Sequence, residues 1–221
     1  MKNKVILHVS LLFVVALSMA SCSENDNKVE EFADWQNVNE AYFQKLYTAT
    51  QQKIASGDTS WKIIRNWSTP EDNTNFKASS TDHIIVHVLN ESTSTSGSPL
   101  YSDSVKVNYR GRLVPSASYV NGYVFDQTYT GTYNPQTAMS VTLAVRGVVD
   151  GFSTALQNMK IGDRWEVYIP YQLGYQTRTS GTVPAYSTLI FDMALVSFYR
   201  AGVDVPEAVS YTHLRAHETG R

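Results

Sequence analysis

The segment Val148–Tyr175 reads VVDGFSTALQNMKIGDRWEVYIPYQLGY and decides the fold of this chain. Four of its apolar residues follow the spacing i, i+3, i+4 and i+7, which predicts a short amphipathic helix with one buried face. These residues are Phe152, Ala155, Leu156 and Met159. After a break at Gly162, the residues Trp165, Val167 and Ile169 alternate as in a half-buried strand. Because a helix this short is marginal on its own, we expect it to cover a sheet.

Apolar and polar residues also alternate on both sides of this segment, which predicts about five strands. The strands are expected at residues 83–89, 105–113, 139–145, 165–169 and 189–195, with the start of a further strand at 123–125. Strands of this kind, with one short helix between those at 139–145 and 165–169, predict an α+β fold class.

A second helix is predicted ahead of the sheet, beginning after Asp34 as its N-cap. Its apolar face is expected to contain Trp35, Val38, Tyr42, Leu46 and Ala49. Residues 34–75 therefore form an N-terminal helical segment, in which 61–67 is too short to classify, and residues 76–208 form the main domain. We expect the helix to pack on the domain, and the alternative is that it joins two copies of the chain.

The N-terminus has the pattern of a targeting segment. Lys2 and Lys4 precede an apolar run, and small residues lead to Cys22, the single cysteine of the chain. Residues 1–21 are similar to a bacterial lipoprotein signal, so Cys22 is expected to carry lipid. Residues 22–33 are then expected to act as a tether. The alternative is an ordinary cleaved signal that leaves Cys22 free. Since Ser23 and not an aspartate directly follows Cys22, we expect the protein at the outer membrane of a Gram-negative cell envelope. The sequence leaves open on which side of that membrane it lies.

Composition excludes several kinds of chemistry. The formal net charge of -2 provides no basic field, so no nucleic-acid partner is expected. His213 and His217 stand four residues apart, but they lack the glutamate of a zinc-protease helix, and no cluster has metal-ligand spacing, so no metal is predicted. Residues 209–221, which include both histidines, look like translated extraneous nucleotide sequence, and we expect this tail to be non-native.

Five short blocks in the second half of the chain resemble one family. In chain order they are VKVNYRGRL at 105–113, VFD at 124–126, VVDGF at 148–152 with ALQNM at 155–159, IP at 169–170 with LGY at 173–175, and VPA at 183–185 with TLIFD at 188–192. Their order and spacing resemble FKBP-type peptidyl-prolyl cis-trans isomerases over residues 83–198. The resemblance implies an antiparallel sheet wrapped around the short helix, no cofactor, and proline-containing polypeptides as partners.

The resemblance also implies a shallow apolar pocket between the sheet and the short helix. Catalytic roles are implied for Tyr109, Phe125, Asp126 and Tyr175. Substrate-binding roles are implied for Met139, Val148, Val149, Phe152, Val183 and Phe191. For Val148 and Phe191 taken alone, a place in the core is the better interpretation, and Asp126 has an alternative as a turn or capping carboxylate.

Within such a pocket, Phe152 is expected to form the floor under the proline ring. The backbone N–H of Val149 and the hydroxyl of Tyr175 are expected to hold carbonyl groups of the substrate, and Asp126 to lie near the rotating carbonyl with Tyr109 and Phe125. The expected reaction is therefore rotation about X-Pro bonds in envelope or secreted polypeptides, without a nucleophile.

Three positions depart from the family pattern. Phe152 stands where the family usually has Trp, Gln176 where Gly commonly follows the tyrosine, and Met139 where an aromatic residue is common. These departures keep an alternative function open, a catalytically weak chaperone or peptide-binding module, and they leave open whether macrolide inhibitors bind.

Overall fold

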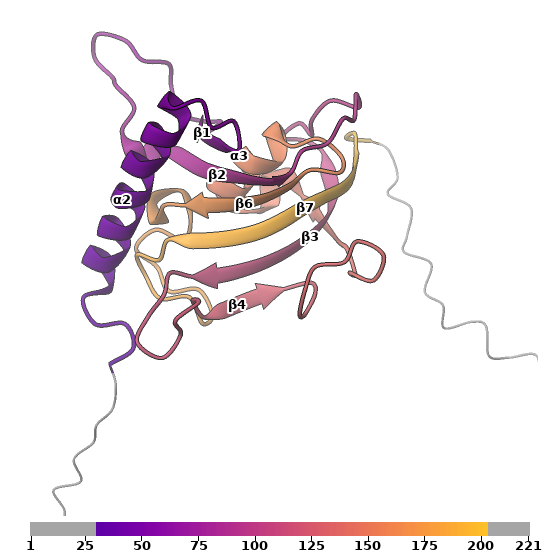
Figure 1. The fold of residues 1–221 in the computed structure, drawn as a ribbon. Helices are drawn as coiled ribbons and strands as arrows, with labels where there is room; N and C mark the ends of the chain where they lie inside the picture. The colour runs from indigo at the N-terminus through magenta and orange to yellow at the C-terminus, as the bar shows by residue number, and fades with distance from the viewer. Residues whose placement is uncertain (1–29, 203–221) are drawn as a thin grey trace, which may run out of the picture. The chain divides into compact units, whose positions relative to one another are not determined.

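The computed structural model describes residues 30–202. In this part of the chain, seven strands form one sheet in the order β1-β2-β6-β7-β3-β4, with β5 also paired to β3, and every pair is antiparallel (Figure 1). The strands are β1 (Trp61–Arg65), β2 (His83–Asn90), β3 (Ser104–Leu113), β4 (Val124–Gln127), β5 (Val141–Ala144), β6 (Arg164–Ile169) and β7 (Leu189–Tyr199). The helices are α2 (Trp35–Ala55) and α3 (Asp150–Asn158), with 3-10 turns η1 (Ser80–Asp82), η2 (Val145–Gly147) and η3 (Tyr171–Leu173).

The α+β fold class is confirmed, and the sheet has more strands than the five or so expected. Helix α3 lies where the apolar spacing predicts it, and all four residues of the predicted face are buried: Phe152, Ala155, Leu156 and Met159. Full burial of a large apolar side chain contributes about 1.5–3 kcal/mol, so this face can hold a nine-residue helix that would not persist alone.

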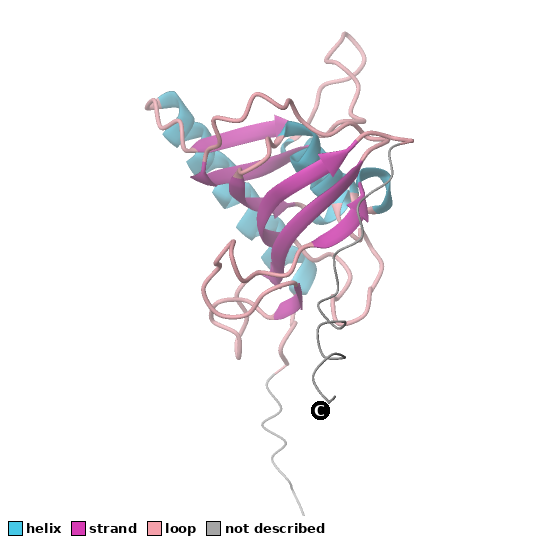
Figure 2. Cartoon of the chain, turned by 90° about the vertical axis from the view of Figure 1, so that its right-hand side faces the viewer, coloured by secondary structure: helices cyan, strands magenta, loops and turns pink. Residues whose placement is uncertain are grey.

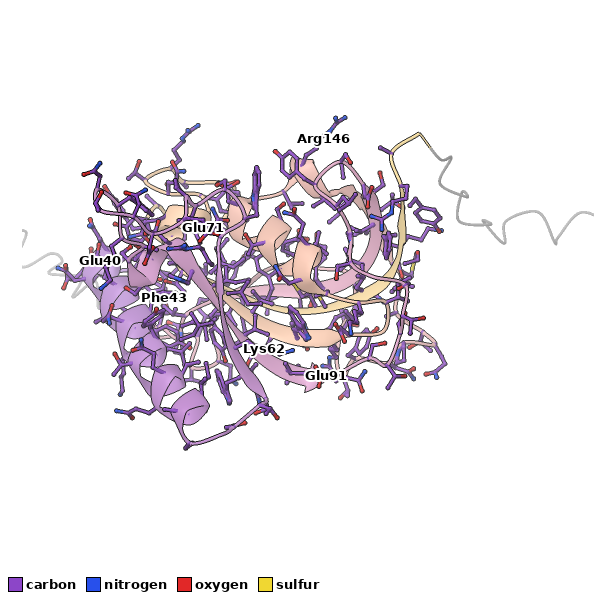
Figure 3. The ribbon with its side chains drawn as sticks, turned by 90° about the horizontal axis from the view of Figure 1, so that it is seen from above. Glu40, Phe43, Lys62, Glu71, Glu91 and Arg146 are labelled. Atoms are coloured by element: carbon purple, nitrogen blue, oxygen red, sulfur yellow. The ribbon has the colours of Figure 1, made fainter. Side chains whose placement is uncertain are left out.

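The opposite face of the sheet is also covered. Ile85 and Ile190 both pair with Tyr168, and residues that pair across strands share a face, which here is the one turned away from α3. All three are buried, because helix α2 packs on this face (Figure 3). The sheet therefore lies between two helices, as the view of Figure 2 also shows.

Helix α2 begins after Asp34 as predicted, but its buried face differs from the predicted one. Trp35 is buried and Tyr42 and Leu46 pack on the core as predicted, but Val38 is 40% exposed and Asn39 and Phe43 are buried, so the centre of the inward face is displaced by one residue. Asp34 also does not cap the helix with its side chain, since its carboxylate accepts a hydrogen bond from the Asn37 side chain at 2.6 Å. Apolar spacing alone could not predict the buried face, because Asn39 is polar and is buried through a hydrogen bond with Thr188.

In the unclassified segment 61–67, residues 61–65 form an edge strand of the sheet, and Trp61 and Ile64 pack against the core. Strand β1 pairs along its whole length with β2. Immediately after β1, the Thr154 hydroxyl of α3 donates a hydrogen bond to the Asn66 side chain at 2.6 Å and accepts one from the Trp67 N–H at 3.2 Å. Helix α3 is thus held by the sheet on one side and by residues 66–67 on another.

Several predictions fall on residues outside 30–202, namely the signal segment 1–21, Cys22 and the tail 209–221. Within the described part of the chain, no helix has the length and apolar character needed to cross a membrane.

We expect Gly151→Ala to destabilise the protein. A Cβ atom at this position would lie 2.3 Å from the Cγ2 atom of Ile169, so α3 could not stay at its present distance from β6. Such overpacking costs about 1–3 kcal/mol, which exceeds the helix-propensity gain of up to about 1 kcal/mol for alanine. Urea denaturation should show the loss.

Gly147→Ala is the control, because its Cβ would meet only the Cβ atom of Ala144, at 3.7 Å. Equal stability of the Gly151→Ala variant and the wild type would contradict the close packing of α3 on β6.

Candidate active site

One cavity of about 200 Å³ brings together eight of the ten residues predicted for the site. These eight are Tyr109, Phe125, Asp126, Val148, Val149, Phe152, Tyr175 and Phe191. They come from β3, β4, the start of α3, the loop after η3 and β7, so only the folded sheet and helix place them side by side. Leu143 and Gly147 complete the lining. Neither residue was predicted from the sequence, although Leu143 belongs to the alternating pattern of its strand.

Aromatic rings form the wall of the cavity. Phe191 lies at their centre, and the ring centroids of Phe152, Phe125 and Tyr109 are 4.9, 5.6 and 6.0 Å from its own. The interplanar angles of these pairs are 86°, 89° and 72°, the edge-to-face arrangement that aromatic quadrupoles favour. Phe152 is only 4% exposed and lies beneath this cluster, which suits a floor.

Gly111 makes this cluster possible. A Cβ atom there would lie 2.6 Å from both the Phe125 Cζ and the Phe191 Cε1 atoms, closer than any real contact. The two rings therefore occupy the space that a side chain on β3 would fill. Gly111 stood in one of the blocks that carry the family resemblance, but its role could not be predicted without knowing which rings lie above it.

Tyr109 and Asp126 form the polar edge of the cavity. The Tyr109 hydroxyl donates a hydrogen bond to Asp126 Oδ2 at 2.7 Å. Burial, and then this hydrogen bond to the carboxylate, raise the pKa of Tyr109 far above its ordinary value of about 10. Tyr109 therefore stays protonated at neutral pH and fixes the direction of the carboxylate.

Two hydrogen-bond donors at the cavity have no partner among residues 30–202. The carbonyl of Val149 accepts a hydrogen bond from the Ser153 N–H at 3.0 Å as α3 begins, while no described residue accepts from the Val149 N–H. The Tyr175 hydroxyl, likewise, has no partner within the described part of the chain. Since unpaired donors at a cavity wall can bind a ligand without first breaking an internal bond, both groups are suited to hold carbonyl oxygens.

The part of the chain that forms this cavity matches a known protein family. Residues 96–196 match the family model described as FKBP-type peptidyl-prolyl cis-trans isomerase. Residues 96–196 belong to this family. The match includes every residue that lines the aromatic cavity, and it confirms the resemblance that the sequence blocks indicate.

Individual relatives of the FKBP-type domain agree with the family model. The chain is 37% identical over 101 residues to the peptidyl-prolyl cis-trans isomerase Mip of Coxiella burnetii. The aligned region covers 45% of this chain and 39% of that protein. It is 33% identical over 99 residues to the FKBP-type 22 kDa peptidyl-prolyl cis-trans isomerase of Escherichia coli, which covers 44% of this chain and 42% of that protein. The chain thus spans less than half the length of these two relatives.

A solved structure of a peptidyl-prolyl cis-trans isomerase from Pseudomonas syringae pv. tomato is similar at a TM-score of 0.45. The two are 20% identical, over 71% of this chain and 96% of that one.

Two of the ten predicted residues lie outside the aromatic cavity of the FKBP-type domain. Met139 is 79% exposed and lines a separate hollow of about 390 Å³ with residues of the loop that follows β4. Val183 is 3% exposed and belongs to the core, where its backbone pairs with Ser180 in an isolated bridge. The spacing of the sequence blocks could not predict these positions, because the two loops that carry Met139 and Val183 have no regular secondary structure.

The departure at Gln176 has a structural consequence. Gln176 has a φ of 58°, in the left-handed region that glycine adopts at little cost. Gly is common at this place in the FKBP-type family, whereas Gln176 must be held there by its surroundings. Its neighbour in the chain is Tyr175, so the position of a predicted catalytic hydroxyl depends on a strained backbone.

Other sites in the FKBP-type domain offer less chemistry. A larger cavity of about 520 Å³ lies between α2 and residues 170–172 but contains none of the ten predicted residues. Among residues 30–202, no group of three or more His, Cys, Asp or Glu side chains is arranged to hold a metal ion.

We expect alkaline pH to weaken the fold through buried tyrosines. Burial and hydrogen bonds to Asp126 and Glu166 raise the pKa of Tyr109 and of Tyr168, respectively. When folding raises the pKa of a tyrosine above the value of about 10 that it has in the unfolded chain, the tyrosine stabilises the fold at pH values below about 10. This stabilisation is lost as the pH rises through the pKa of the tyrosine in the folded protein. Urea denaturation between pH 8 and 11 should show a free energy of unfolding that falls above pH 10.

Tyr109→Phe should show a smaller fall over the same pH range. Tyr101→Phe, which removes a hydroxyl from a 41% exposed side chain, is the matched control. Identical pH dependence of Tyr109→Phe and the wild type would exclude this account of Tyr109.

Proposed function

We propose that the aromatic cavity catalyses cis/trans rotation about X-Pro bonds in envelope or secreted polypeptides. The observation that supports this proposal most strongly is that eight of the predicted site residues line one cavity. The barrier to rotation, about 18–20 kcal/mol, comes from amide resonance. A site lowers that barrier when it binds the twisted amide more tightly than either planar form, and this needs neither a nucleophile nor a cofactor.

The size of the cavity suits a single proline ring. Its volume of about 200 Å³ lies below the roughly 300–1,000 Å³ of sites for drug-sized ligands. The apolar floor at Phe152 would receive the ring, and a macrolide inhibitor would have to extend beyond the cavity onto its rim.

The polar groups are placed around that ring. The Val149 N–H and the Tyr175 hydroxyl would hold substrate carbonyl groups on either side of the rotating bond. The Asp126 carboxylate would lie beside the rotating carbonyl. Its orientation is fixed by the hydrogen bond of 2.7 Å that it accepts from the Tyr109 hydroxyl. Because the twisted amide is less polar than the planar one, the aromatic wall would also favour it by excluding water.

Rotation of a proline peptide measured by NMR exchange spectroscopy tests the proposal. The protein should accelerate exchange, and Tyr175→Phe and Asp126→Ala should each lower kcat/KM about 2–10-fold, the effect of one hydrogen bond in the transition state. Tyr101→Phe is the matched control and should leave kcat/KM unchanged.

Absence of acceleration at high protein concentration would overturn the proposed activity. If the same protein then prevented aggregation of a proline-free client, the alternative function of a peptide-binding chaperone would take its place.

For the location of the protein, we propose anchoring in the envelope of a Gram-negative bacterium through lipid on Cys22. A similar protein of Legionella longbeachae, 35% identical over 108 residues, is named outer membrane protein MIP. Together with the charged, apolar and small-residue order of residues 1–22, this supports an outer-membrane location. Residues 22–33 would then separate the domain from the lipid.

We expect Cys22→Ala to move the full chain from the membrane fraction to the soluble fraction of such a bacterium and to abolish its acylated mass. Without acyl chains, nothing would hold the protein firmly at the bilayer. Ser23→Ala, the neighbouring control, should stay with the membranes. A Cys22→Ala protein that stays fully membrane-bound would exclude this anchor.

A further inference from the structure

Helix α2 holds the end of the loop between β6 and β7 through a buried asparagine. Asn39 has no exposed surface. Its side-chain oxygen accepts a hydrogen bond from the Thr188 N–H at 2.7 Å, and its amide nitrogen donates to the Trp35 carbonyl at 2.7 Å. Since a buried backbone N–H is costly to leave unpaired, Asn39 fixes the position of Thr188.

Two further contacts extend this attachment to both ends of the loop. The Trp35 Nε1–H donates to the Ser187 hydroxyl at 2.8 Å, and that hydroxyl donates to the Pro184 carbonyl at 2.7 Å. At the start of the loop, the Tyr171 hydroxyl donates to the Glu40 carboxylate at 3.0 Å. Figure 3 shows Glu40 and Phe43 along α2, on the helix that carries these contacts.

Apolar packing and hydrogen bonds together join α2 to this part of the molecule, since Trp35 and Phe43 also belong to the buried core. The cavity of about 520 Å³ lies here, lined by Asn39 and Phe43 on the helix and by Pro170, Tyr171 and Thr188 on the other side. Beside this cavity, the polar contacts add to the apolar packing of the helix.

Bonds inside the loop transmit the attachment to Tyr175. The Tyr171 carbonyl accepts hydrogen bonds from the N–H groups of Gly174 and Gln176, at 3.0 and 2.9 Å. The Tyr186 N–H donates to the Gln176 carbonyl at 2.8 Å, next to Ser187. Gln176, which is held at positive φ, is thereby fixed from both ends of the loop.

From these contacts we infer that α2 positions the aromatic cavity, and that Asn39 and Trp35 are positioning residues for the Tyr175 hydroxyl. Neither residue lines the cavity, so their effect passes through the loop. The kinetic part of this inference rests on the proposed function, while its structural part does not.

The structural test is hydrogen exchange in the full chain. Asn39→Ala, and Trp35→Phe, which keeps a ring but loses the Nε1–H donor, should each speed exchange of the amides of residues 173–187 roughly tenfold, as expected for one lost buried hydrogen bond. Amides of β3 should exchange as in the wild type. Gln51→Ala, an exposed change on the same helix, should have no effect.

The kinetic test is a double-mutant cycle with Tyr175→Phe. Asn39→Ala should lower kcat for the proline peptide several-fold, and this loss should shrink when the Tyr175 hydroxyl is already absent. A residue that matters only for stability would leave kcat per folded molecule unchanged.

Unchanged exchange in residues 173–187, or equal effects of Asn39→Ala with and without the Tyr175 hydroxyl, would overturn the inference. If the wild type itself shows no isomerase activity, the proposed function fails, and the exchange experiment still decides whether α2 holds the loop.

Discussion

The contact between Phe152 and Phe191 is the interaction on which both the core and the cavity depend. Phe152 belongs to the apolar face that attaches α3 to the sheet, and Phe191 belongs to β7, which lies between β6 and β3. Their edge-to-face packing at 4.9 Å therefore joins helix to sheet and also forms the base of the cavity. The same burial that stabilises the fold sets the shape of the candidate site, so site and core cannot vary independently.

The parts of the fold that depend on local spacing could be predicted from the sequence. The 3.6-residue period of Phe152, Ala155 and Leu156 predicted both α3 and its inward face. A short helix with one apolar face can bury that face only by turning it toward the core. The inward face of α2 was predicted only in part: Trp35 is buried, but Val38 is exposed, and Asn39 is buried because it accepts a hydrogen bond from Thr188, far away in the chain. Strand β1 could not be classified from the sequence, because a segment this short does not show a period.

The candidate site shows the same division. Residues on strands or at the start of α3, such as Tyr109 and Val149, lie at the cavity where the family resemblance places them. Met139 and Val183 do not, because the paths of the loops that carry them depend on tertiary contacts; Tyr175, from the same loop as Val183, does reach the cavity. Gly111 could not be assigned a role, since its importance lies in the rings that occupy the space above it.

The attachment of α2 also has a consequence for the order of events during synthesis. Asn39 and Thr188 are 149 residues apart, and Trp35 and Ser187 are 152 apart, so a growing chain cannot form either contact until β6 and the loop after it have been made. Contacts that close such long loops form slowly and late, because the entropy of closure must be lost before they are gained. The attachment of α2 to this loop thus forms late, although the helix is synthesised early, and the Tyr175 loop reaches its final form only when the chain is nearly complete.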